Sequence, residues 1–195
     1  SYSNGNYAVL AAIVERLSKT RFEDYIIKNI FIPSGIKAAY YSEYTKLPRA
    51  VSYSYSPERD PLGLNARTPV KKTEDQPELE YSGFSLGYLT AEDVYRFLLA
   101  LRTGKILSPQ MVSYLTAGKV EVEMGSPVKY GYGFYDTNMW GVEMRGHSGG
   151  GSNSGIGADA EMIWNNEYDV VVLGNYDLEV VRPLSLSIAR FLGTK

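Results

Sequence analysis

Residues 146–151, with the sequence Gly-His-Ser-Gly-Gly-Gly, combine features that acyl-transfer sites need. His147 is the single histidine of the chain, and histidine is the side chain whose unperturbed pKa lies closest to neutral pH. Glycines such as Gly149 and Gly150 let another molecule approach the backbone, or let backbone N–H groups face a ligand. An N–H group aimed at a developing oxyanion is the usual partner of a nucleophile in acyl transfer. The alternative interpretation is a glycine-rich turn with an incidental surface histidine.

A tyrosine and an asparagine, Tyr2 and Asn4, lie two residues apart immediately before the first expected helix. Such a pair could direct polar groups into a cleft. Because tyrosine has an unperturbed pKa near 10, Tyr2 would act as a base at neutral pH only if cations lowered that pKa, at roughly 1.4 kcal/mol per unit. The alternative is that Asn4 caps the helix and Tyr2 packs.

The elements that must hold these motifs follow from the spacing of apolar residues. Helical spacing and capping signals predict helices over 6–19, 20–32, 90–103, 109–117 and 182–192. An alternating pattern predicts strands over 119–124, 130–135, 140–145, 158–164 and 168–173. Strands joined by short turns imply an antiparallel sheet, so the sequence predicts an α+β fold of the α/β sandwich type, with helices flanking that sheet.

Three local details of these helices can be checked. Thr20 and Glu23 fit a capping box, and Thr90 is expected to cap the third helix with Asp93 at its third position. In the last helix, four apolar residues share one side: Leu184, Ile188, Phe191 and Leu192. The proline-containing stretch 37–82 is expected to be irregular, with a short strand near Val51–Tyr55.

The composition excludes several classes of protein. The formal net charge of −2, without any block of like charges, argues against nucleic acid as a partner. No run of eighteen apolar residues exists, so no membrane span is expected. The absence of cysteine and the single histidine exclude a thiolate nucleophile, a cysteine metal site and a multi-histidine metal site.

Six short segments, taken in order, resemble motifs of the serine beta-lactamase-like and penicillin-binding-protein family, which includes class C beta-lactamases, D,D-peptidases and esterases. Tyr2-Ser3-Asn4 resembles its Tyr-x-Asn motif, and Gly146–Gly150 resembles its Gly-His-x-Gly-Gly motif, the counterpart of Lys-Thr-Gly. The other four similar segments are Ile32–Ile36, Gly87–Val94, Tyr130–Phe134 and Val170–Asn175. The resemblance implies one beta-lactamase/transpeptidase-like domain over 1–195, with a mainly helical and loop part at 1–118 and antiparallel strands plus a terminal helix at 119–195.

The resemblance also implies residue roles. Tyr2 would transfer protons with the nucleophile, and Asn4 would bind the acyl-side amide of the substrate. His147 and Ser148 would hold polar groups of the substrate and tune the electrostatics around Tyr2. Gly149 would line the substrate site, and the Gly150 N–H would form half of the oxyanion hole. The reaction would run through an acyl-enzyme on a small-molecule or peptide substrate (a beta-lactam, a D-amino-acid peptide or an ester), without a cofactor.

The family's nucleophile lies in a Ser-x-x-Lys motif upstream of Tyr-x-Asn. Only Ser1 precedes Tyr2, and the Ser-x-x-Lys strings at 34–37 and 126–129 do not open an expected helix. The sequence is therefore expected to be the C-terminal part of a serine hydrolase, inactive alone, whose N-terminal portion is supplied as a second chain or by a swapped copy. The family favours an extracytoplasmic location, and histidine in place of lysine favours peptidases or esterases. The alternatives are a non-catalytic ligand-binding relative and an unrelated interaction domain.

Overall fold

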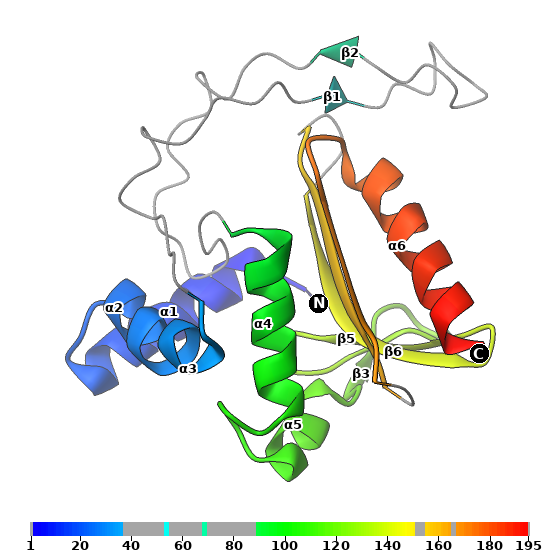
Figure 1. The fold of residues 1–195 in the computed structure, drawn as a ribbon. Helices are drawn as coiled ribbons and strands as arrows, with labels where there is room; N and C mark the ends of the chain where they lie inside the picture. Colours follow the sequence, from blue (N-terminus) through cyan, green and yellow to red (C-terminus); the bar gives the residue numbers. More distant parts are fainter. Residues whose placement is uncertain are drawn as a thin grey trace. The chain divides into compact units, whose positions relative to one another are not determined.

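The computed structural model describes residues 2–36, 89–150, 155–164 and 167–194, together with the backbone of Tyr53–Ser54 and Thr68–Pro69 (Figure 1). Its described residues divide into two compact units. The helical unit comprises those within 1–48 and 77–112, and the sheet unit comprises those within 49–76 and 113–195. The motif around Tyr2 therefore belongs to the helical unit, and the motif around His147 belongs to the sheet unit.

The helical unit contains a run of short helical segments and one longer helix. Its elements are α1 (Asn4–Ser18), α2 (Phe22–Ile26), the π-helical segment η1 (Ile27–Phe31), α3 (Ile32–Ser34) and α4 (Ala91–Arg102). Helix α1 begins two residues earlier than its periodicity suggests. Gly35, with φ of +74°, ends the run that begins with α2, because glycine adopts this left-handed conformation without strain.

The capping box expected at Thr20 and Glu23 is wrong. Arg21 is the residue that precedes α2, and its own side chain does not cap the helix. The Glu23 carboxylate forms an ion pair with Arg21 instead. The Phe22 N–H donates to Glu15 Oε1 of α1 at 2.7 Å, so a side chain from the preceding helix satisfies the start of α2.

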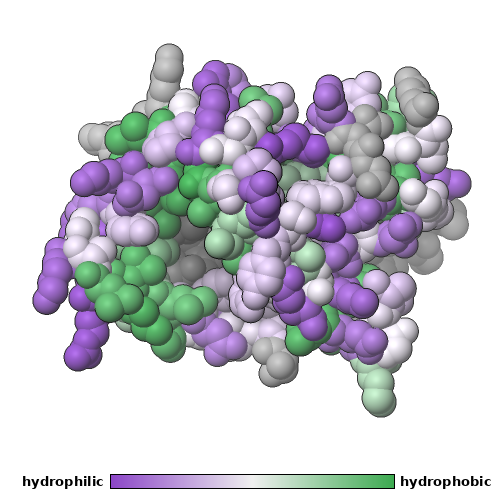
Figure 2. Space-filling view, turned by 90° about the horizontal axis from the view of Figure 1, so that it is seen from below, coloured by the Kyte–Doolittle hydropathy of each residue, from purple (hydrophilic) through white to green (hydrophobic). Residues whose placement is uncertain are grey.

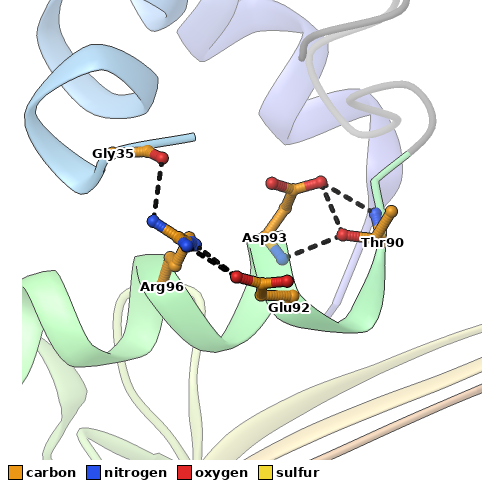
Figure 3. Close-up of polar contacts among 5 residues, drawn as sticks. All are labelled: Gly35, Thr90, Glu92, Asp93 and Arg96. Atoms are coloured by element: carbon orange, nitrogen blue, oxygen red, sulfur yellow. Dashed lines mark hydrogen bonds and ion pairs between the residues drawn. The ribbon is translucent and has the colours of Figure 1, made fainter. Parts of the chain in front are cut away.

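The capping box at the start of α4 is present, as expected (Figure 3). Thr90 Oγ1 accepts a hydrogen bond from the Asp93 N–H at 3.1 Å, and the Asp93 carboxylate accepts one from the Thr90 N–H at 3.1 Å. One turn later, Arg96 pairs with Glu92 and donates to the Gly35 carbonyl oxygen at 3.3 Å. These contacts fix both the start of α4 and its place beside α3.

Replacing Thr90 by alanine is expected to lower the free energy of unfolding by about 1 kcal/mol, because the Asp93 N–H then loses its acceptor. Chemical denaturation measures the change. Thr20→Ala is the matched control and should cost only a few tenths of a kcal/mol, since the Thr20 hydroxyl donates to Ser18 O and caps no helix. Equal effects of the two substitutions would contradict the assignment of the cap.

The sheet unit is built on a six-stranded antiparallel sheet of order β3-β4-β5-β6-β7-β8. Its strands are β3 (Val120–Glu121), β4 (Lys129–Tyr130), β5 (Tyr135–Met139), β6 (Val142–Gly150), β7 (Gly157–Ile163) and β8 (Asp169–Gly174). Helix α6 (Leu178–Gly193) lies along one face of this sheet (Figure 1). Two further elements are α5 (Pro109–Thr116), which crosses the boundary between the units, and the short pair β1 (Tyr53–Ser54) and β2 (Thr68–Pro69). The α+β class with an antiparallel sheet is confirmed.

The core of the sheet unit lies between α6 and the central strands. Its buried members are Val142, Met144, Ile163, Val170 and Ala189. Helix α6 presents Val181, Ser185 and Ala189 to this core at four-residue spacing. Three of the four residues expected on the apolar side, Leu184, Ile188 and Phe191, therefore face away from the sheet and are 37–61% exposed. The fourth, Leu192, packs against the core.

Two strands differ from the sequence prediction in a way that matters for the motif. Residues 130–135 do not form one strand, because a turn separates β4 from β5. Strand β6 is longer than expected and runs through Gly150, so residues 146–150 of the glycine-rich motif are paired sheet rather than the turn after a strand. Pairing with β7 aligns His147 with Ala160 and Ser148 with Asp159.

Apolar side chains remain exposed in both units. In α1 these are Val9, Leu10, Ile13 and Leu17, which are 46–78% exposed. The face drawn in Figure 2 shows apolar patches among hydrophilic side chains. Among the helices of the described residues, none combines the length and apolar character needed to cross a bilayer.

Candidate active site

Tyr2 and Asn4 interact directly in the helical unit. The Tyr2 hydroxyl donates to Asn4 Oδ1 at 2.9 Å, and the Tyr2 ring lies 6.2 Å from the ring of Tyr7. Ser3 is the residue that precedes α1, and Asn4 is its first helical residue. The Asn4 side chain therefore does not cap the helix, as the alternative interpretation required. It holds the phenol of Tyr2, which is 53% exposed.

Strand β6 is anchored two residues before His147. Arg145 is buried and donates to the Ser113 carbonyl oxygen at 3.4 Å and to Thr116 Oγ1 at 3.3 Å. Its guanidinium also lies 3.8 Å from the centre of the Trp164 ring. These contacts tie the middle of β6 to the C-terminal end of α5. They fix the backbone from which His147 projects.

His147 is held among aromatic rings in the sheet unit. Its Nε2 lies 3.0 Å from the Tyr130 hydroxyl, and its ring centre lies 5.1 Å from that of Tyr135. Burial lowers the pKa of His147 below its usual 6.5, and the positive charge of Arg182 adds to this lowering, whereas a hydrogen bond to the Ser148 backbone opposes it. The imidazole is therefore neutral at pH 7. A neutral imidazole has one donor and one acceptor nitrogen, and here Tyr130 and the Ser148 backbone are their partners.

The glycines of β6 differ in how much space surrounds them. Gly150 adopts φ of +119°, which only glycine adopts without strain, and lies against the backbone of Ile156. A side chain at Gly146 would meet the Ala160 carbonyl oxygen and the Glu161 carboxylate of β7. At Gly149 no atom of the described residues lies within 4 Å of the place where a Cβ would sit. Gly149 therefore gives a ligand open access to the backbone.

Sequence reasoning missed three charged residues beside the motif. Asp159 and Glu161 of β7 are 1% and 5% exposed, and Arg182 of α6 reaches Ser148 of β6. The signal was present in the acidic residues at 159 and 161 within an otherwise apolar strand. It could not be used without the register, which places Asp159 opposite Ser148 and Glu161 opposite Gly146.

The candidate residues thus fall into two groups. Tyr2 and Asn4 are joined by a hydrogen bond in the helical unit. The second group, His147, Ser148, Gly149 and Gly150, lies on one strand of the sheet unit. That both groups line one cleft remains a prediction. No cluster of three or more histidine, cysteine, aspartate or glutamate side chains that could hold a metal occurs in the described part of the chain.

The two Ser-x-x-Lys strings have the wrong surroundings for a nucleophile. Ser34 is the last residue of α3, is 7% exposed and donates its hydroxyl to the Ile30 carbonyl oxygen at 2.6 Å. Ser126 lies between β3 and β4, where its hydroxyl accepts the Val128 N–H at 3.1 Å. Neither serine opens a helix.

The chain resembles proteins of one family by sequence and by fold. The sequence profile of the beta-lactamase family, described as Beta-lactamase, matches residues 1–184. PbpX of Bacillus subtilis, named as a candidate penicillin-binding protein, is 32% identical over 136 residues, which cover 69% of this chain and 31% of PbpX.

Solved structures show the same fold at lower identity. A penicillin-binding protein from Bacillus halodurans superposes with a TM-score of 0.76 at 21% identity, covering 96% of this chain and 55% of its own. The D-amino acid amidase of Ochrobactrum anthropi, solved with L-phenylalanine amide, gives 0.73 at 21% identity, covering 98% and 56%. The chain thus spans about half the length of these structures. The match over 1–184, together with the likeness to PbpX, shows that the chain belongs to the beta-lactamase family of serine beta-lactamases and penicillin-binding proteins.

Proposed function

We propose that this chain is the C-terminal part of a serine hydrolase that cleaves an amide or ester bond through an acyl-enzyme. The observation that carries the proposal is the placement of the Gly-His-x-Gly-Gly motif. It lies on a paired strand, with a neutral His147 held by Tyr130 and an unobstructed backbone at Gly149. A rigid strand that presents backbone N–H groups and a neutral side chain suits a substrate-binding edge.

In this proposal the two groups of residues act on the same substrate. The Tyr2 phenol, already oriented by Asn4, transfers the proton between the nucleophilic serine and the leaving group. Asn4 binds the acyl-side amide. On β6, His147 and Ser148 bind polar groups of the substrate, and the Gly150 N–H donates to the oxyanion of the tetrahedral intermediate.

The nucleophile itself is proposed to come from outside residues 1–195. Both internal Ser-x-x-Lys strings lie away from helix starts, and the Ser34 hydroxyl donates a hydrogen bond to the Ile30 carbonyl oxygen. The matched structures are nearly twice as long as this chain. The missing group would be supplied by a preceding segment, a second chain or a swapped copy.

An amide or ester of a D-amino acid is the proposed class of substrate. The D-amino acid amidase superposes over nearly the whole chain, and histidine at position 147 replaces the lysine of beta-lactamases. The test is hydrolysis of D-phenylalanine amide, its L-enantiomer, an aryl ester and a beta-lactam by the complete gene product. Faster turnover of D-phenylalanine amide than of its L-enantiomer supports the proposal, and the reverse order would contradict the proposed class. Failure to hydrolyse all four would contradict it.

A non-catalytic ligand-binding relative is the second candidate, favoured by the lack of a helix-opening Ser-x-x-Lys within the 195 residues. Such a protein would keep the binding groups of β6 and would bind these compounds without releasing product. Calorimetric binding in the absence of turnover distinguishes it from the hydrolase.

A further inference from the structure

A buried polar cluster lies between β7 and α6, and the proposed function does not use it. Asp159, Glu161 and Ser185 are 1%, 5% and 0% exposed. Both carboxylate oxygens of Asp159 and the Ser185 hydroxyl lack a hydrogen bond of normal geometry within the described part of the chain, although Ser185 lies close enough to Asp159 to lower the pKa of that carboxyl. Buried carboxyls without full compensation are costly, so such a cluster calls for a functional reason.

The two carboxyls occupy one face of β7. Residues 159 and 161 are two apart in a strand, so their side chains point to the same side as Ile163, which packs on α6. Gly146, opposite Glu161, leaves room for the Glu161 carboxylate where any larger residue would clash. Burial raises the pKa of Glu161 to about 8, and the neighbouring charge of Asp159 adds to that rise.

Arg182 is the cation that faces this cluster from α6. Burial raises the pKa of Asp159 and of Glu161, and the positive charge of Arg182 opposes that rise. At His147 burial lowers the pKa, and the same charge adds to the lowering. The Arg182 Nη1 donates to Ser148 Oγ at 3.4 Å, and its guanidinium lies 5.7 Å from the centre of the Tyr135 ring. The Arg182 side chain thus interacts both with the buried acids of β7 and with His147 and Ser148 of β6.

We propose that Arg182 is a positioning residue of the candidate active site: it holds the Ser148 hydroxyl, and its guanidinium lies by the Tyr135 ring that contacts His147. The buried carboxyls of Asp159 and Glu161 face the same cation, because the charge of Arg182 lowers the pKa of each against the rise caused by burial. Arg182 thereby couples α6 to both β6 and β7. The inference rests on the function proposed for His147 and Ser148, but the charge arrangement can be measured without turnover.

The groups that face His147 and Arg182 are few in the described residues. Tyr130 and Tyr135 contact the imidazole, Arg182 acts on it from α6, and the Ser148 backbone accepts a hydrogen bond from it. Asp159 and Glu161 act on Arg182 from β7. Removing the charge of Arg182 should therefore raise the pKa of His147.

The experiment is an NMR titration of His147 in the complete gene product, with the signal assigned by its loss in His147→Gln. We expect Arg182→Gln to move the His147 titration to higher pH and Arg182→Lys to leave it near the wild-type position. Arg190→Gln is the matched control, because it removes the same charge from α6, where Arg190 lies 5.1 Å from the Trp140 ring. An unchanged titration in Arg182→Gln, or an equal shift in Arg190→Gln, would overturn the inference.

Kinetics supply a second, independent test. Arg182→Lys keeps the charge but not the guanidinium geometry at Ser148, so KM is expected to rise more than kcat falls. This variant decides the question if Arg182→Gln does not fold, and wild-type kinetics in it would overturn the positioning role. If the gene product hydrolyses nothing, the proposed function fails while the NMR result still stands. If the gene product is active but the pKa of His147 is unchanged in Arg182→Gln, only the present inference fails.

Discussion

Replacing Gly146 by alanine is expected to lower the free energy of unfolding of the sheet unit by at least about 3 kcal/mol. The new methyl group would meet the Ala160 carbonyl oxygen and the Glu161 carboxylate. The first belongs to the backbone of the paired strand β7, which cannot move without breaking the ladder. The second is a buried carboxylate with little room to turn. Relief of either clash therefore disrupts the strand that carries His147.

Urea unfolding followed by tryptophan fluorescence measures this effect, because both tryptophans, Trp140 and Trp164, lie in the sheet unit. Gly149→Ala on the same strand is the matched control. Its Cβ would enter open space, so we expect a change of less than about 1 kcal/mol. Similar losses in the two variants would show that Gly146 does not lie against β7 as described.

Replacing Glu161 by glutamine is expected to change how stability depends on pH by a few kcal/mol. In the folded state the pKa of Glu161 is raised to about 8, from 4.5 for an ordinary glutamate. Between these values the folded protein binds a proton that the unfolded chain releases. The free energy of unfolding of the wild type therefore falls as pH rises from about 4.5 to about 8. The slope reaches about 1.4 kcal/mol per pH unit where the folded state holds this proton and the unfolded chain has released it.

Glutamine cannot ionise, so Glu161→Gln should lack this decline and become more stable than wild type toward pH 9. Unfolding free energies from urea titrations at pH 5, 7 and 9 test the prediction. Glu123→Gln removes an exposed carboxyl from the same unit and should follow the wild-type profile. Parallel profiles for wild type and Glu161→Gln would mean that Glu161 is not a buried acid.

The sequence was most informative where structure is local. The start of α4 was predicted correctly, because the reciprocal hydrogen bonds of its capping box join Thr90 and Asp93, which lie only three residues apart. The same pattern misled at Thr20, where Glu15 of the preceding helix caps α2 instead. A pattern of residue types cannot show that a competing partner lies nearby in space.

Helix α6 shows a second limit of periodicity. Apolar residues lie on two sides of this helix. The buried side carries Val181, Ser185 and Ala189, so a serine stands in the middle of it. The more apolar stripe of Leu184, Ile188 and Phe191 is the exposed one. Composition alone would choose the wrong side, because the side that faces the sheet is decided by packing against small and polar partners.

The candidate site was predictable as two motifs but not as a network. His147 and its glycines were named from their types, and the structure places them on β6. The contributions of Tyr130, Arg182 and Asp159 depend on strand register and on the path of α6, which bring together residues up to 34 positions apart. The spacing of residue types along the chain cannot predict such contacts.

The central claim is that the chain supplies Tyr2 and the motif of β6 to a serine nucleophile located elsewhere. Intact-mass spectrometry after treatment with a fluorophosphonate, a reagent that labels activated serines, tests it most directly. We expect the complete gene product to gain one adduct on a serine outside residues 1–195, and Tyr2→Phe to label about a hundredfold more slowly, because a proton-transfer group has been removed. No adduct, or an adduct on a serine within residues 1–195, would contradict the account.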